Sequence, residues 1–113
     1  MAKVIITRSL FKEIERRFKS EAHKIIDLME SLENNPKKGK PLGQVSGIVI
    51  KEIKYKSFRF YFITDGFKLK TLEIQELNDL LIKFVRISDK KNQQKVINEI
   101  KEVLKKIGEE GFD

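Results

Sequence analysis

Two cationic side chains are expected to face each other in a β-hairpin formed by residues 48–63. Folding this run about Lys56 and Ser57 with a two-residue turn places Lys54 opposite Arg59. Like charges that face each other across a sheet repel, so the fold alone gains nothing from this pair. We therefore predict that a negatively charged group binds there.

The same register brings further polar side chains next to this pair. Glu52 lies opposite Tyr61, on the face that also carries Lys54 and Arg59, because side chains alternate along a strand. Lys51 falls on the other, apolar face, and a bulge or a register slip would be needed to expose it. The hairpin is thus predicted to have one face for a core and one for a ligand.

These residue types suit cleavage of RNA. Attack by a 2′-hydroxyl on the neighbouring phosphate needs a base, an acid for the leaving oxygen and positive charge on the phosphate. Arg59 offers a permanently charged fork that meets phosphate in a bidentate manner. Lys54 is a candidate base, since a neighbouring cation disfavours the protonated amine. Tyr61 could stack on a base or donate a hydrogen bond, and Glu52 could act as the base or neutralise Lys54.

Cations on a later strand could join this group. Arg86 lies in the run 80–87, which should pair with the strand that carries Arg59. Lys83 is expected on the face opposite Arg86, by alternation. The alternative explanation is that all these cations are ordinary solvated side chains on an open antiparallel face.

Other kinds of active site find no support in the sequence. The chain has one histidine and no cysteine, and its acidic residues lack the spacing of metal ligands. His23 lies beside the apolar stripe of a predicted helix, where a surface or partly packed histidine is expected. No Ser–His or Cys–His pair is indicated, and no glycine motif precedes a helix in the way that phosphate-binding loops do. We expect neither a metal nor a cofactor.

The elements that hold these residues follow from the apolar pattern. Residues 3–7 are a β-branched run that predicts a first strand. Apolar residues then recur at helical spacing and predict two helices, the second capped by Ser20. This αα-hairpin ends at Asn35 and Pro36, because the residue before a proline disfavours the helical region. A basic loop over residues 37–43, marked by glycine and proline, leads into the β-hairpin.

The second half of the chain supplies another strand and a last helix. Residues 67–79 alternate loosely and are interpreted either as a continued strand or as a poorly ordered excursion. Residues 80–87 form a near-continuous apolar run, which predicts a strand that is central in the sheet or covered on both faces. A helix then begins at Asp89 or Asn92, and Gly108 suits the position just after its end.

The predicted fold class is α+β. The N-terminal strand and the αα-hairpin pack on one face of a mainly antiparallel sheet, whose consecutive strands form a meander, and a C-terminal helix ends the chain. The other face of the sheet is expected to be open. Residues 1–113 are expected to form one domain, since this length supports a single core.

The charge balance favours a polyanionic partner. Lys and Arg number 24 against 17 Asp and Glu, which gives a net charge of +7. Nucleic acid or an acidic protein segment would suit this surplus, and a solubilising surface is the alternative. No signal peptide or membrane span is indicated, so the protein is expected in the cytoplasm and away from membranes.

The order of elements resembles the RelE/ParE toxin superfamily, and most closely its HigB-like, phage-derived branch. No motif is diagnostic alone, and the resemblance rests on order and spacing over nearly the whole chain. Its parts are the first strand, the αα-hairpin ending at Asn35-Pro36, the basic loop, the strands Ile50–Lys54, Phe58–Phe62 and Leu80–Ile87, and Asp89–Lys91 before a closing helix.

The resemblance implies the RelE-like toxin domain of a toxin–antitoxin module. Such a protein would cleave mRNA in the ribosomal decoding site as a metal-independent endoribonuclease, and a cognate antitoxin protein would bind it. The implied catalytic residues are Lys54, Arg59 and Arg86. Candidate substrate-binding residues are Lys51, Glu52, Tyr61, Lys83, Lys90 and Lys91.

The chain also departs from the family pattern. The tyrosine that some members carry near the C-terminus has no counterpart, nor does the catalytic histidine of HigB-like members. The connection over residues 67–79 is longer than usual. Two alternatives therefore stay open: a ParE-like toxin that inhibits a topoisomerase, and a nucleic-acid-binding protein that kept the fold without catalysis.

Overall fold

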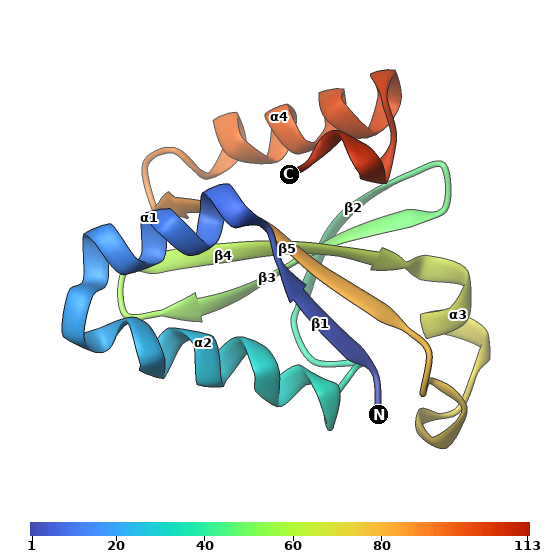
Figure 1. The fold of residues 1–113 in the computed structure, drawn as a ribbon. Coiled ribbons are helices and arrows are strands. Elements are labelled where there is room, and N and C mark those ends of the chain that lie inside the picture. The colour runs from blue at the N-terminus through green and yellow to red at the C-terminus, as the bar shows by residue number, and fades with distance from the viewer.

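Two layers of helices enclose a five-stranded sheet in the computed structural model, which describes residues 1–113 (Figure 1). The strand order is β1-β5-β4-β3-β2, with β1 parallel to β5 and all other neighbours antiparallel. The strands are β1 (Lys3–Ile6), β2 (Lys40–Val45), β3 (Ile48–Tyr55), β4 (Phe58–Asp65) and β5 (Leu81–Asp89). The α+β class and the β3-β4-β5 meander are confirmed.

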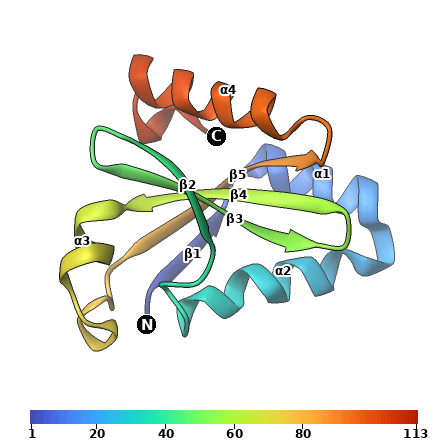
Figure 2. The same cartoon turned by 180° about the vertical axis from the view of Figure 1, so that it is seen from behind.

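The helices α1 (Arg8–Phe18) and α2 (Ala22–Glu30) cover one face of the sheet, as predicted (Figures 1 and 2). Ser20 does not cap α2, because a 3-10 turn over Lys19–Glu21 joins the two helices and α2 begins only at Ala22. The core between these helices and the sheet includes Leu10, Ile14, Ile25, Met29, Ile53, Phe60, Phe62, Ile82 and Phe84.

The helix α4 (Gln93–Lys106) covers the other face, so the prediction of an open face is wrong. Its apolar stripe needs a surface to bury it, and one half of this sheet face is apolar. The second core consists of Val45, Ile50, Tyr61, Ile63, Val85, Ile97, Ile100, Leu104 and Phe112. Gly108 follows α4 with a φ of +102°, as expected for a residue that ends a helix. None of the helices combines the length and the apolar character needed to cross a bilayer.

The register of the β3–β4 hairpin matches the prediction. Tyr55 pairs with Phe58 and Lys54 with Arg59, and the pairing continues without a slip to the far end of both strands. The turn uses a positive φ of 55° at Lys56, which is the geometry that two-residue hairpin turns require. The alternation of side chains therefore separates the two faces of the hairpin as expected.

A strand forms where a basic loop was predicted for residues 37–43. β2 pairs with β3 from Lys40 onward and lies at the edge of the sheet. Its register shifts between Pro41 and Gly43. Proline is tolerated in a strand at a sheet edge or a bulge, so the composition that indicated a loop also fits this edge strand.

The excursion after β4 is helical, which neither sequence interpretation included. It contains the short helix α3 (Gly66–Thr71) and a 3-10 turn over Ile74–Glu76. The Asp65 carboxylate accepts a hydrogen bond from the Lys68 backbone N–H at 3.0 Å and so caps α3.

A β-bulge in β5 changes which side chains share a face. The β4–β5 register slips between Tyr61 and Phe62, which leaves Val85 as an extra residue. Because one residue is added, Lys83 and Arg86 both lie on the α4 side of the sheet. Their predicted placement on opposite faces is therefore wrong.

Candidate functional site

Six polar side chains form two neighbouring rows across β3, β4 and β5, on the face that α4 covers. The row nearer the hairpin turn contains Lys54, Arg59 and Ser88, and the next row contains Glu52, Tyr61 and Arg86. We call these six residues the polar rows. They lie next to the apolar core of this face, to which Tyr61 also belongs, near the end of β5 from which the chain continues into α4.

Lys54 and Arg59 are neighbours in the structure, but only Lys54 is exposed. The Arg59 side chain is 11% exposed, and its Nε lies 3.9 Å from Oε2 of Glu52. That distance permits charge attraction but exceeds a hydrogen bond. Arg59 Nε and Glu52 Oε1 are buried without any hydrogen-bond partner. Native proteins rarely leave such atoms unpaired, so they mark this pair as a candidate site.

Tyr61 has no exposed surface, because α4 packs over it. Its hydroxyl and that of Ser88 share a hydrogen bond of 2.7 Å. Burial raises the pKa of the Tyr61 phenol. The predicted stacking of Tyr61 on an RNA base does not fit this position, and the ring instead belongs to the core.

Arg86 is half-buried and already has protein partners. Its Nη1 donates to the carbonyl oxygen of Val85 at 2.8 Å, and its guanidinium lies 5.0 Å from the centre of the Phe112 ring. A guanidinium over an aromatic face is attracted by the ring quadrupole. Arg86 is thus a member of the polar rows that also holds the C-terminal segment.

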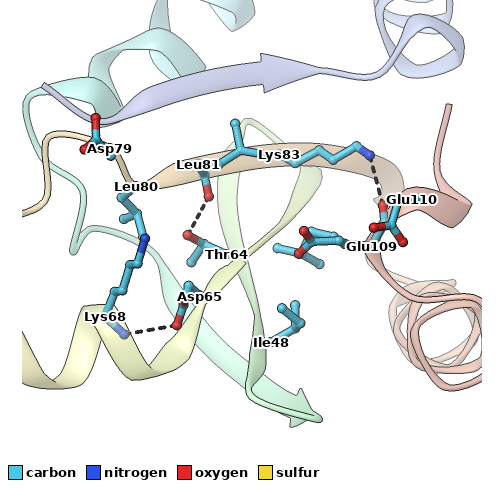
Figure 3. Close-up of a pocket in the computed structure, with 11 residues that line it drawn as sticks. Ile48, Thr64, Asp65, Lys68, Asp79, Leu80, Leu81, Lys83, Glu109 and Glu110 are labelled. Atoms are coloured by element: carbon cyan, nitrogen blue, oxygen red, sulfur yellow. Dashed lines mark hydrogen bonds between the residues drawn. The ribbon is translucent and has the colours of Figure 1, made fainter.

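Lys83 also binds the C-terminal segment rather than facing the solvent freely. Its amine donates to the carbonyl oxygens of Glu109 at 2.9 Å and Phe112 at 3.1 Å. Lys83 lines a hollow of about 360 Å³ together with Asp65, Lys68, Asp79, Glu109 and Glu110 (Figure 3). Charges of both signs line this hollow, so it has no clear preference for an anion.

Lys51 lies on the opposite side of the sheet from Lys54, as the alternation predicted. It is 5% exposed, and its amine donates to the carbonyl oxygen of Lys37 at 2.9 Å. Burial lowers the pKa of the Lys51 ammonium. Lys51 therefore cannot act together with Lys54 and Arg59 on one phosphate.

Lys90 and Lys91 are exposed in the turn between β5 and α4. This turn begins at Asp89, whose carboxylate accepts hydrogen bonds of 2.9 Å from the backbone and side chain of Asn92. The hydrogen bonds from Asn92 lower the pKa of the Asp89 carboxyl. The structure thus fixes the turn and leaves both lysine side chains in solvent.

The side chains that could bind a metal ion do not cluster anywhere in the structure. No group of three His, Cys, Asp or Glu side chains lies close enough to hold a metal ion. His23 is exposed on α2, away from the polar rows.

Comparisons with models of protein families, with curated proteins and with solved structures find no match for this chain. The resemblance to the RelE/ParE superfamily therefore stays a prediction from the order of the elements.

Proposed function

We propose that this chain is a RelE/ParE-type toxin that binds translated mRNA and cleaves it at the polar rows. The observation that carries the proposal is the Lys54–Arg59 pair beside a buried carboxylate with a free oxygen. The two facing cations suit the binding of a phosphate. The carboxylate, which lacks one hydrogen bond, adds a group that can act as a base when the phosphate is cleaved.

Each residue then has a distinct role. Arg59 would hold the phosphate, with its guanidinium kept in place by Glu52 at 3.9 Å. Glu52 would take a proton from the 2′-hydroxyl only after RNA binding moves the side chains that cover its buried Oε1, which has no hydrogen-bond partner. Lys54 is exposed and would neutralise charge on the phosphate and protonate the 5′-oxygen that leaves as the P–O5′ bond breaks. Lys90 and Lys91 would attract the RNA backbone from the neighbouring turn.

The same proposal covers the partner and the location of the protein. A basic chain that harms translation needs an inhibitor, and an acidic antitoxin segment that folds on this surface would provide one. Ribosomes and their messages place this activity in the cytoplasm. The net charge of +7 supports a polyanionic substrate and an acidic inhibitor alike.

One observation favours the alternative of a binding protein without catalysis. The helix α4 covers Tyr61, and Arg86 already has partners in Val85 and Phe112. Tyr61 and Arg86 are therefore less available to an RNA substrate than the sequence analysis predicted. The exposed cations Lys54, Lys90 and Lys91 would still bind RNA phosphates.

Controlled expression in bacteria tests the proposal. The wild-type chain should stop growth and produce truncated messages, and Lys54→Ala should relieve both effects. Lys105→Ala removes the same charge from an exposed position in the last turn of α4 and should remain toxic. Growth arrest with intact messages would contradict the nuclease and favour a ParE-like action on a topoisomerase. Normal growth with wild-type protein present would favour the non-catalytic binding protein.

A further inference from the structure

A second group of cations surrounds a hollow of about 490 Å³ on the other side of the sheet. It lies between the chain before β2, the β2–β3 pair and the short helix α3. Lys37, Lys51 and Lys70 line it together with the amide of Gln44, and no carboxylate does. We call this hollow the Lys51 pocket. None of its cations belongs to the polar rows.

Lys51 is the most deeply buried cation of the pocket, with 5% of its surface exposed. Its amine donates to the Lys37 carbonyl oxygen at 2.9 Å and lies 5.9 Å from the centre of the Phe62 ring. The chain's salt bridges, four in all, do not include it. An ammonium can donate three hydrogen bonds, and a single carbonyl uses only one of them.

A purely structural role does not account for a charge at this position. Burying an ammonium is costly unless a counter-charge and further hydrogen bonds compensate for the lost water. Lys37 and Lys70 add positive charge instead of a counter-charge. A methionine would fill similar space beside Phe62 without that cost. The retained charge thus indicates that a negative group enters the pocket.

We propose that the Lys51 pocket binds a terminal phosphate group of a small molecule. Such a group has several acceptor oxygens, which can meet the Lys51 amine, the two other lysines and the Gln44 amide together. A volume of about 490 Å³ suits a small ligand. A phosphate inside an RNA strand carries a nucleotide on both sides and would reach the buried amine less easily. The pocket does not depend on the proposed cleavage of mRNA.

Calorimetric titration of the full chain with inorganic pyrophosphate at low ionic strength tests this site. The wild-type chain should bind, and Lys51→Met and Lys70→Ala should each weaken binding roughly ten- to hundred-fold, as expected for a lost charge-assisted hydrogen bond. The matched control is Lys68→Ala, which removes the same charge from the same helix but does not line the pocket. It should change the dissociation constant by less than about threefold, through long-range charge alone.

Thermal unfolding separates a ligand site from a structural tether. Lys51→Met should unfold at the wild-type temperature or above, while it loses pyrophosphate. A lower unfolding temperature with unchanged binding would overturn the proposal. If Lys51→Met does not fold, the comparison of Lys70→Ala with Lys68→Ala decides the question, and equal weakening in both would also overturn it.

Two further results would count against the site. Absence of pyrophosphate binding by the wild-type chain would overturn it directly. Displacement of bound pyrophosphate by a short RNA without terminal phosphates would show that the pocket takes internal RNA phosphates instead. Loss of mRNA cleavage in Lys54→Ala has no bearing on these outcomes, because Lys54 lies on the other side of the sheet.

Discussion

Arg59 lies 3.9 Å from Glu52, measured from Nε to the carboxylate Oε2, in a largely buried layer between the sheet and α4. The two charges attract each other, yet Arg59 Nε and Glu52 Oε1 are left without hydrogen bonds. The exposed Lys54, on β3, lies directly opposite Arg59, on β4. A phosphate that approaches from solvent would therefore meet Lys54 first and reach the buried pair only if neighbouring side chains move.

The Glu52–Arg59 pair should also control stability. Arg59→Ala leaves the Glu52 carboxylate buried and unpaired, which we expect to lower the free energy of unfolding by about 3–5 kcal/mol. The combined change Glu52→Met and Arg59→Met removes both charges and should cost much less. Urea unfolding monitored by circular dichroism measures the free energy of unfolding of the single and the double variant. Equal stability of Arg59→Ala and the wild-type chain would show that the pair is not coupled.

Much of the hairpin could be predicted from the sequence, because its register depends on local rules. Alternation and a two-residue turn are enough to pair Lys54 with Arg59 and to place Lys51 on the other face. The bulge at Val85 follows no such rule, so the face on which Lys83 lies was predicted wrongly.

The burial of the site could not be predicted in the same way. The apolar stripe of α4 is visible in the sequence, but periodicity does not say which surface it covers. Its position over Tyr61 depends on contacts between residues far apart in the chain. The Lys51 pocket likewise combines segments that are far apart in the chain. The only sequence feature that indicated an unusual site there was the position of Lys51 on an apolar face.

Lys83 should hold the end of the chain against the sheet. Lys83→Met removes the donor to the Glu109 and Phe112 carbonyl oxygens, and each lost bond should cost about 1 kcal/mol. Amide hydrogen exchange in residues 109–113 should become faster, while exchange in α1 and α2 stays the same. Unchanged protection at the C-terminal segment would contradict this role.

Lys51 should make the stability of the protein depend on pH in the alkaline range. Its pKa is lowered by burial, so between that folded value and the ordinary value of 10.5 the unfolded chain binds more protons. Its contribution to the free energy of unfolding therefore rises with pH in this window and is least favourable below it. We expect the advantage of Lys51→Met over the wild-type chain to shrink as the pH rises.

Urea unfolding of both proteins at several pH values from neutral to alkaline measures this difference. Other titrating groups are common to the two chains and cancel in the comparison. A constant difference across the whole range would mean that the folded and unfolded chains hold the Lys51 proton equally well.

The chemistry of the cleaved RNA ends tests the central claim most directly. Purified protein should be added to a reconstituted translation reaction with an end-labelled message. The account predicts upstream fragments that end in a 2′,3′-cyclic phosphate or its hydrolysis product, no cleavage when the attacking 2′-hydroxyl is replaced by hydrogen, and a loss of rate of at least about tenfold in Lys54→Ala, within the range typical for such groups. A message that stays intact with the wild-type protein, or cleavage that Lys54→Ala leaves unchanged, would contradict it.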